Sequence, residues 1–308
     1  MQGVLKRTIE ETAAAILASP KGMLVADEYA EALVPSTAEL ALRETALTDH
    51  ISALLLTAET FAATLPLRRQ LSESPAELPL VGVRMAPTGT GVRDRLVEAA
   101  RDCASFVEWR AHLSPLDVPH GATHIEADKL ASAAAATQSE GLLPVLTIAM
   151  PDLGSSSITV NQATTTNALL ALRDQLQRTG VDARQLLIRL NMVVAGLSHP
   201  SPATPDQVAR QTLQLLEWAL PSGTPGVLLL SGGQSLDQAC ANLSAVSALA
   251  AKRGVPWRVT FGFSRALVAA ASGAPGDDDA AARKLLVQSA RRASESTTAA
   301  RVPEKAGS

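Results

Sequence analysis

Cysteine, long hydrophobic runs and surplus positive charge are all scarce in this sequence. Two cysteines in 308 residues, Cys103 and Cys240, exclude a disulfide framework and a Cys-x-x-Cys zinc site. The apolar runs are strand-sized, and residues 1–16 have the pattern of an amphipathic helix without the apolar core of a signal peptide. We therefore expect a soluble, cytoplasmic protein that does not enter a membrane.

The charge balance further limits the possible partners. The formal net charge is −3, and arginines are scattered among acidic residues, so no basic surface for nucleic acid is expected. Hydrophobic residues make up 46% of the chain, which is enough for a large core. The composition predicts a globular protein whose partners are small molecules.

Short apolar runs alternate with helical patterns along the chain. The runs predict buried parallel strands at Gly22–Asp27, Ile51–Thr57, Leu78–Met85, Ser105–Arg110, Leu142–Ala149, Gln185–Met192, Gly226–Gly233 and Trp257–Ser264. Helices are predicted at residues 30–50, Arg93–Cys103, Glu126–Glu140, Thr164–Thr179, Thr204–Ala219 and Leu236–Ala251.

This alternation predicts an α/β fold, a single (β/α)₈ TIM barrel over residues 1–293. A doubly wound open sheet is the alternative, but the sequence has no Gly-x-Gly-x-x-Gly turn to support it. Residues 294–308 are polar, and we expect them to form a mobile tail. In a barrel, the functional residues lie where the strands end.

The segment from Gly226 to Ser235 has the pattern of a phosphate site. An apolar strand leads into Ser231, Gly232 and Gly233, and a helix follows. Glycines let the backbone approach a ligand closely, and the N–H groups of a following helix attract anions. The next strand leads into Arg265, so two neighbouring strand ends are expected to meet at one anion.

Charged and polar residues occur at most of the predicted strand ends. A single charge there is usually solvated or part of a structural ion pair. Several around one barrel mouth favour a site for an anionic, phosphorylated small molecule. The residues are Asp27, Glu28, Glu59, Arg84, Glu108, Arg110, Thr147, Arg189, Asn191, Ser231 and Arg265.

Several motifs, in family order over about Ile16–Leu267, resemble class I fructose-1,6-bisphosphate aldolase. They are Lys21-Gly-Met-Leu-Val-Ala-Asp27-Glu28, Phe106-Val-Glu-Trp109-Arg110, Gly141-Leu-Leu-Pro-Val, Asn191-Met-Val, Leu230-Ser-Gly-Gly-Gln-Ser235 and Pro256-Trp-x-x-Thr-Phe-x-x-x-Arg265-Ala-Leu. The resemblance implies a (β/α)₈ barrel that handles ketose bisphosphates and dihydroxyacetone phosphate without a metal or cofactor. It also implies a homo-oligomer, since family members are commonly tetramers.

The sequence departs from this family at its catalytic positions. The family's imine-forming lysine, in a Lys-Pro-Asn-Met motif, is here Arg189, and a protonated guanidinium cannot form that imine. The fourth-strand lysine is here Glu108, and the fifth-strand Glu-Pro-Glu is Thr147-Ile-Ala. The lysine after the third strand falls near residues 86–88. Of the central groups, only Asp27 matches.

Neither a relocated lysine nor a metal offers a replacement. None of the six lysines ends a predicted strand: Lys6, Lys21, Lys129, Lys252, Lys284 and Lys305. The five histidines fall in predicted helices or loops, so no metal site is expected. Together, the substitutions Arg189 and Glu108 predict an ion pair across the barrel mouth.

The phosphate-binding residues of the family are better preserved. By resemblance, Leu230, Ser231, Gly232 and Arg265 bind one phosphate, and Arg110 lies near the other end of the substrate. The contacts for a second phosphate are altered at residues 27–32, so a monophosphate is the more natural ligand. Alternatively, the glycine turn is purely structural.

The sequence leaves several functions open. The favoured one is a non-cleaving, sugar-phosphate-binding pseudoenzyme derived from an aldolase. An enzyme with repurposed acid/base chemistry would use Asp27, Glu108 and Arg189, and would need a raised carboxylate pKa beside a pocket. An authentic aldolase (lyase) with an altered mechanism and a purely structural partner protein are the remaining alternatives.

Overall fold

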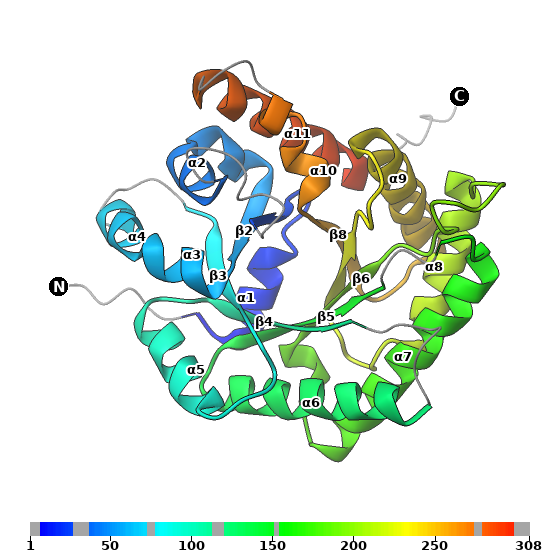
Figure 1. Cartoon of the computed structure of the whole chain (residues 1–308), viewed down its shortest axis with the longest axis horizontal. Coiled ribbons are helices and arrows are strands. Elements are labelled where there is room, and N and C mark those ends of the chain that lie inside the picture. The colour runs from blue at the N-terminus through cyan, green and yellow to red at the C-terminus, as the bar shows by residue number, and fades with distance from the viewer. Residues whose placement is uncertain are drawn as a thin grey trace, which may run out of the picture.

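Eight parallel strands close into a barrel, with helices around its outside (Figure 1). The computed structural model describes residues 7–26, 37–72, 78–112, 120–150, 154–273 and 279–298. The strands are β1 (Gly22–Ala26), β2 (Ile51–Leu56), β3 (Leu80–Met85), β4 (Phe106–His112), β5 (Leu143–Ala149), β6 (Leu187–Asn191), β7 (Gly226–Leu230) and β8 (Arg258–Phe263). They pair in sequence order, and β1 pairs with β8. The predicted (β/α)₈ barrel is confirmed.

The helices follow the strands around the barrel. They are α1 (Ile9–Ile16), α2 (Thr37–Arg43), α3 (Ala58–Ala63), α4 (Leu65–Ser72), α5 (Val92–Arg101), α6 (His120–Ser139), α7 (Ile158–Arg178), α8 (Pro205–Ala219), α9 (Leu236–Arg253), α10 (Arg265–Val268) and α11 (Asp279–Thr298). The side chains of Ser157, Thr204 and Ser235 accept hydrogen bonds from the first turns of α7, α8 and α9. No helix among the described residues is long and apolar enough to span a bilayer.

Several parts of this helical layer differ from the sequence prediction. Helices α6 and α7 begin at His120 and Ile158, before the predicted starts at Glu126 and Thr164. Helices α3 and α4 follow β2, where no helix was predicted. Helix α11 continues to Thr298, beyond the expected domain boundary at residue 293. Ser294 is only 2% exposed, and the Thr297 hydroxyl donates to the carbonyl of Pro20 at 3.1 Å. Residues 294–298 therefore pack on the barrel rather than starting a tail.

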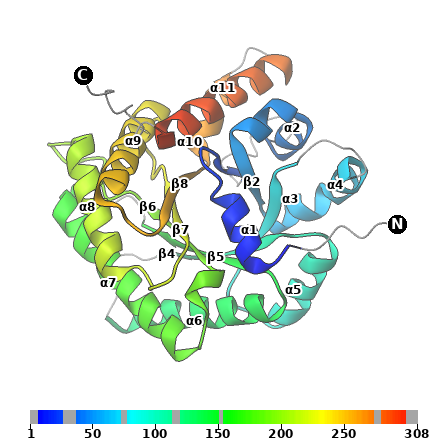
Figure 2. The same ribbon diagram turned by 180° about the vertical axis from the view of Figure 1, so that it is seen from behind.

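Apolar side chains fill the barrel at its N-terminal end. Helix α1 lies across this end (Figure 2). The Ser52 hydroxyl donates to the Ile16 carbonyl at 2.6 Å, and Arg258 Nη1 donates to the Leu17 carbonyl at 3.4 Å. Met23, Val25, Ala53, Leu55, Phe106, Leu143, Val145, Leu187 and Leu228 form one buried cluster with Ile16 and Leu17. We call this cluster the apolar plug. It closes one end of the barrel, and the polar groups lie toward the other end.

Candidate functional site

An ionic layer lies above the apolar plug, built by side chains that alternate along the strands. On β4, Phe106 belongs to the plug, and Glu108 and Arg110 follow it on the same face. The parallel register pairs Arg84 with Glu108, and Thr147 with Arg189. Four neighbouring strands thus deliver polar groups to one level of the barrel.

Glu108 is the centre of this layer. Arg189 Nη1 donates to Glu108 Oε1 at 2.6 Å, and Thr147 Oγ1 donates to the same oxygen at 2.6 Å. Arg84 Nε donates to the other oxygen, Oε2. The Arg189–Glu108 pair expected from the sequence is present. Arg84, which was predicted only as one of the charged strand ends, joins this pair as a third charged group.

Both charges of the central pair are removed from solvent. Glu108 and Thr147 are 0% exposed, and Arg189 is 1% exposed. Arg189 uses its remaining donors on the Gly262 carbonyl, which accepts from Nε at 3.2 Å and from Nη2 at 2.9 Å. The guanidinium therefore spans the barrel from β6 to both β4 and β8.

The surroundings hold Glu108 ionised. Burial alone would raise its pKa, but the charges of Arg189 and Arg84 and the Thr147 hydrogen bond outweigh burial and lower the pKa to about 2. Burial lowers the pKa of the Arg189 guanidinium, and the Glu108 carboxylate opposes that change. Because arginine loses its proton only far above neutrality, both groups are charged at pH 7.

Gly262 provides the space that the Arg189 side chain occupies. A Cβ atom at residue 262 would lie 2.9 Å from Arg189 Nε and 3.3 Å from Arg189 Cδ. This role could not be predicted from the sequence, because a glycine in a strand has many possible causes. The buried position of the Arg189 side chain therefore requires a residue without a side chain at position 262.

Arg110 adds a further positive charge at the mouth of the barrel. It is half-buried, and its Nε is enclosed without a hydrogen-bond partner in the described part of the chain. Its charge contributes to lowering the pKa of Arg189, so the two guanidinium groups influence each other. This arrangement favours an anion over a cation at the mouth.

The glycine turn and Arg265 meet as expected from the sequence. Gly232 and Gly233 have φ values of +60° and +84°, a left-handed conformation that suits glycine. A Cβ atom at Gly233 would lie 3.7 Å from Arg265 Nη2. The ends of β7 and β8 therefore bring the exposed Arg265 guanidinium next to the turn.

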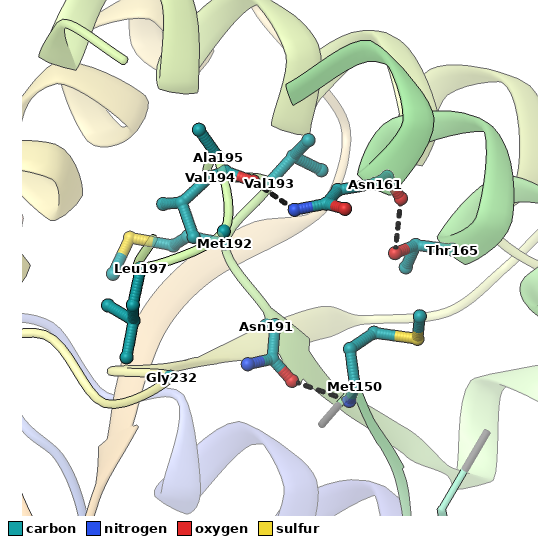
Figure 3. Close-up of a pocket in the computed structure, with 11 residues that line it drawn as sticks. Met150, Asn161, Thr165, Asn191, Met192, Val193, Val194, Ala195, Leu197 and Gly232 are labelled. Carbon is teal, nitrogen blue, oxygen red and sulfur yellow. Dashed lines mark hydrogen bonds between the residues drawn. The ribbon is translucent and has the colours of Figure 1, made fainter. Parts of the chain in front are cut away.

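Asn191, at the end of β6, supports the same turn. Its Oδ1 accepts from the Met150 N–H at 2.9 Å, and its Nδ2 would lie 2.7 Å from a Cβ atom at Gly232. These groups border a small cavity of about 40 Å³ (Figure 3). Leu230 is paired with Asn191 across the sheet, and Ser231 is buried.

The structure does not describe every predicted site residue. Asp27 and Glu28 lie outside the described residues. The described lysines lie before β1 or on outer helices: Lys21, Lys129, Lys252 and Lys284. No group of three or more potential metal-ligating His, Cys, Asp or Glu side chains occurs within residues that the structure describes.

Comparison with known proteins identifies the family. The family model described as fructose-bisphosphate aldolase class-I matches residues 80–307. The chain belongs to the class I fructose-bisphosphate aldolase family.

Similar aldolases occur in animals and bacteria. Fructose-bisphosphate aldolase B of Bos taurus is 29% identical over 88% of this chain and 83% of its own length. The probable fructose-bisphosphate aldolase class 1 of Xylella fastidiosa (strain 9a5c) is 29% identical over 85% and 88%.

A solved structure of a family member has a closely similar fold. The fructose-bisphosphate aldolase of Plasmodium falciparum, in complex with TRAP and a small molecule inhibitor, matches with a TM-score of 0.79. It is 26% identical, and the match covers 94% of each chain. The site of this aldolase-family chain therefore lies on a barrel of the family's own architecture.

Proposed function

We propose that this aldolase-family protein binds a phosphorylated small molecule and does not cleave sugar bisphosphates through a Schiff base. The observation that carries the proposal is the state of Arg189, which resemblance assigns to the lysine position. Its guanidinium is buried and hydrogen-bonded to Glu108 and Gly262. It cannot attack a ketone, and moving it would remove one of the two positive charges that compensate the buried Glu108 carboxylate.

The binding half of the proposal is supported by the positive groups at the mouth. Arg110 Nε is enclosed without a hydrogen-bond partner among the described residues, and Arg265 lies beside the backbone of Gly233. Guanidinium groups and turn N–H groups are strong ligands for phosphate oxygens. Because the family's second set of phosphate contacts is altered, a monophosphate is the proposed ligand.

Repurposed acid/base chemistry has less support. A general acid or base needs a pKa near the working pH, which for a carboxyl group means a raised value. The pKa of Glu108 is lowered to about 2, and all its described surroundings stabilise the charged form apart from burial itself. Glu108 is therefore better suited to holding Arg84 and Arg189 than to transferring protons.

Phosphorus NMR tests binding and cleavage in one experiment. Fructose 1,6-bisphosphate and dihydroxyacetone phosphate are each added to the wild-type protein, to Arg265→Ala and to a control, Arg178→Ala, on the exposed end of α7. We expect line broadening with the wild type and control, reduced broadening with Arg265→Ala, and no new peaks. Triose-phosphate peaks appearing from the bisphosphate would contradict the proposal.

Two further features stay predictions. A homo-oligomer is inferred from the family alone, and a cytoplasmic location from the sequence alone. Sedimentation of the purified protein and fractionation of its source cells would test them.

A further inference from the structure

In the described part of the chain, charged side chains occupy the centre of this barrel. Arg189, Glu108 and Arg84 join across the level at which the family's chemistry takes place, and the first two are fully buried. Within the described residues, a ligand whose phosphate binds at the glycine turn meets this network if its organic part points along the barrel axis. The described structure offers a groove beside that turn.

This groove lies between the segment after β6 and the start of α9. Its volume is about 440 Å³, within the range of roughly 300–1,000 Å³ typical of small-molecule sites. The lining includes Leu197, Pro202, Ala203, Ala241, Gln238 and Asn242. No lysine, arginine, aspartate or glutamate occurs among the described residues that line it.

The groove is continuous with the proposed phosphate site. A Cβ atom at Gly233 would lie 3.7 Å from Arg265 Nη2 and equally 3.7 Å from Leu197 Cδ1. Figure 3 shows the Leu197 side chain extending toward the Gly232 turn. The Arg265 guanidinium and the Leu197 side chain therefore both border the same glycine.

Hydrogen bonds fix the inner wall of the groove relative to the turn. The Ser231 carbonyl accepts from Gln234 Nε2 at 2.7 Å, and Gln234 Oε1 accepts from Asn242 Nδ2 at 2.5 Å. Gln234 and Asn242 are both buried and both line the groove. Turn and wall are thus one preorganised unit, which reduces the entropy lost on binding.

We propose that this groove binds a neutral, ring-sized organic group of a phosphate monoester whose phosphate lies at Ser231–Gly233 and Arg265. The inference rests on the proposed phosphate-binding function and specifies its ligand. His199 is the one titratable side chain among the described lining residues, so a neutral group is favoured, and Leu197, Pro202 and Pro205 supply apolar contact. The ligand runs outward over α9 instead of inward to Arg189.

Calorimetric titration with phenyl phosphate and methyl phosphate tests this placement, because the two ligands share one headgroup. We expect phenyl phosphate to bind about tenfold more tightly, as burial of part of a ring would give. In Leu197→Ser the two affinities become similar. Val160→Ser, which also removes an exposed apolar side chain but lies outside the groove, keeps the difference.

The other outcomes separate the two proposals. Equal affinities for the two esters in the wild type, or a preference for phenyl phosphate that survives Leu197→Ser, would contradict the inference about the groove. Neither result would contradict phosphate binding. If neither ester binds, the proposed phosphate-binding function fails, and the groove inference fails with it.

Discussion

At the scale of single residues, the molecule is distinguished by one carboxylate held between two arginines. Glu108 accepts hydrogen bonds from Arg189, Arg84 and Thr147 in a site without solvent. Such a buried group adds little net stability compared with an apolar core, but removing one partner leaves a charge uncompensated. The network is therefore costly to break and unsuited to proton transfer.

Replacing Glu108 by glutamine is expected to destabilise the fold by about 3–5 kcal/mol, since the buried Arg189 and the partly buried Arg84 lose their anion. The free energy of unfolding of the variant should also lack the pH dependence that Glu108 gives to the wild type. The pKa of Glu108 falls from an ordinary 4.5 to about 2 on folding, so its stabilising contribution is complete above pH 4.5 and disappears as the pH falls toward 2.

Urea unfolding of both proteins between pH 3 and pH 7 measures this difference. Each protein should unfold in a single transition for the comparison to hold. Equal stabilities of wild type and Glu108→Gln at pH 7 would show that the ion pair is not structural.

Gly262→Ala is expected to destabilise the fold by about 1–3 kcal/mol, because the new methyl group would overlap the Arg189 side chain. The same change made in an Arg189→Ala background should cost less. Thermal unfolding of the four proteins in this cycle gives the coupling. A cost independent of residue 189 would mean that Gly262 serves another purpose.

At the scale of elements, the strands were predictable and part of the helical layer was not. Buried parallel strands are continuous apolar runs, which the sequence shows directly. Helices α3 and α4 are short, and Arg68, buried between Phe61 and the Asp102 carbonyl, breaks their apolar pattern. The network could be foreseen as an Arg189–Glu108 pair, but Arg84 and Gly262 needed three-dimensional register.

Helix α11 shows why the C-terminal boundary was misplaced. Its last residues are serine, threonine and glutamate, which read as a tail, yet Ala290, Ala293 and Ser294 face the barrel. Small polar residues can be buried on a helix that packs closely, and composition does not reveal which face they occupy.

A chain ending at residue 293 is therefore expected to be less stable than one ending at residue 298, by about 1–3 kcal/mol. The shorter form loses buried Ser294 and the hydrogen bond from Thr297 to Pro20. Differential scanning calorimetry of the two truncations makes the comparison. Identical melting temperatures would restore the boundary predicted from the sequence.

At the scale of the whole molecule, a barrel of the aldolase family holds a charged network at its centre. The N-terminal end is closed by the apolar plug around α1, the middle by the Arg84–Glu108–Arg189 network, and the mouth keeps Arg110, Arg265 and the glycine turn. We interpret this as a binding protein built on an aldolase scaffold.

Borohydride trapping tests this account most directly. The wild-type protein is incubated with dihydroxyacetone phosphate, reduced with borohydride, and its intact mass is measured, with an active class I aldolase treated in parallel. A Schiff base would be reduced to a stable secondary amine on lysine. The account predicts an unchanged mass for this protein and an adduct on the control enzyme. An adduct on any lysine of this chain would contradict it.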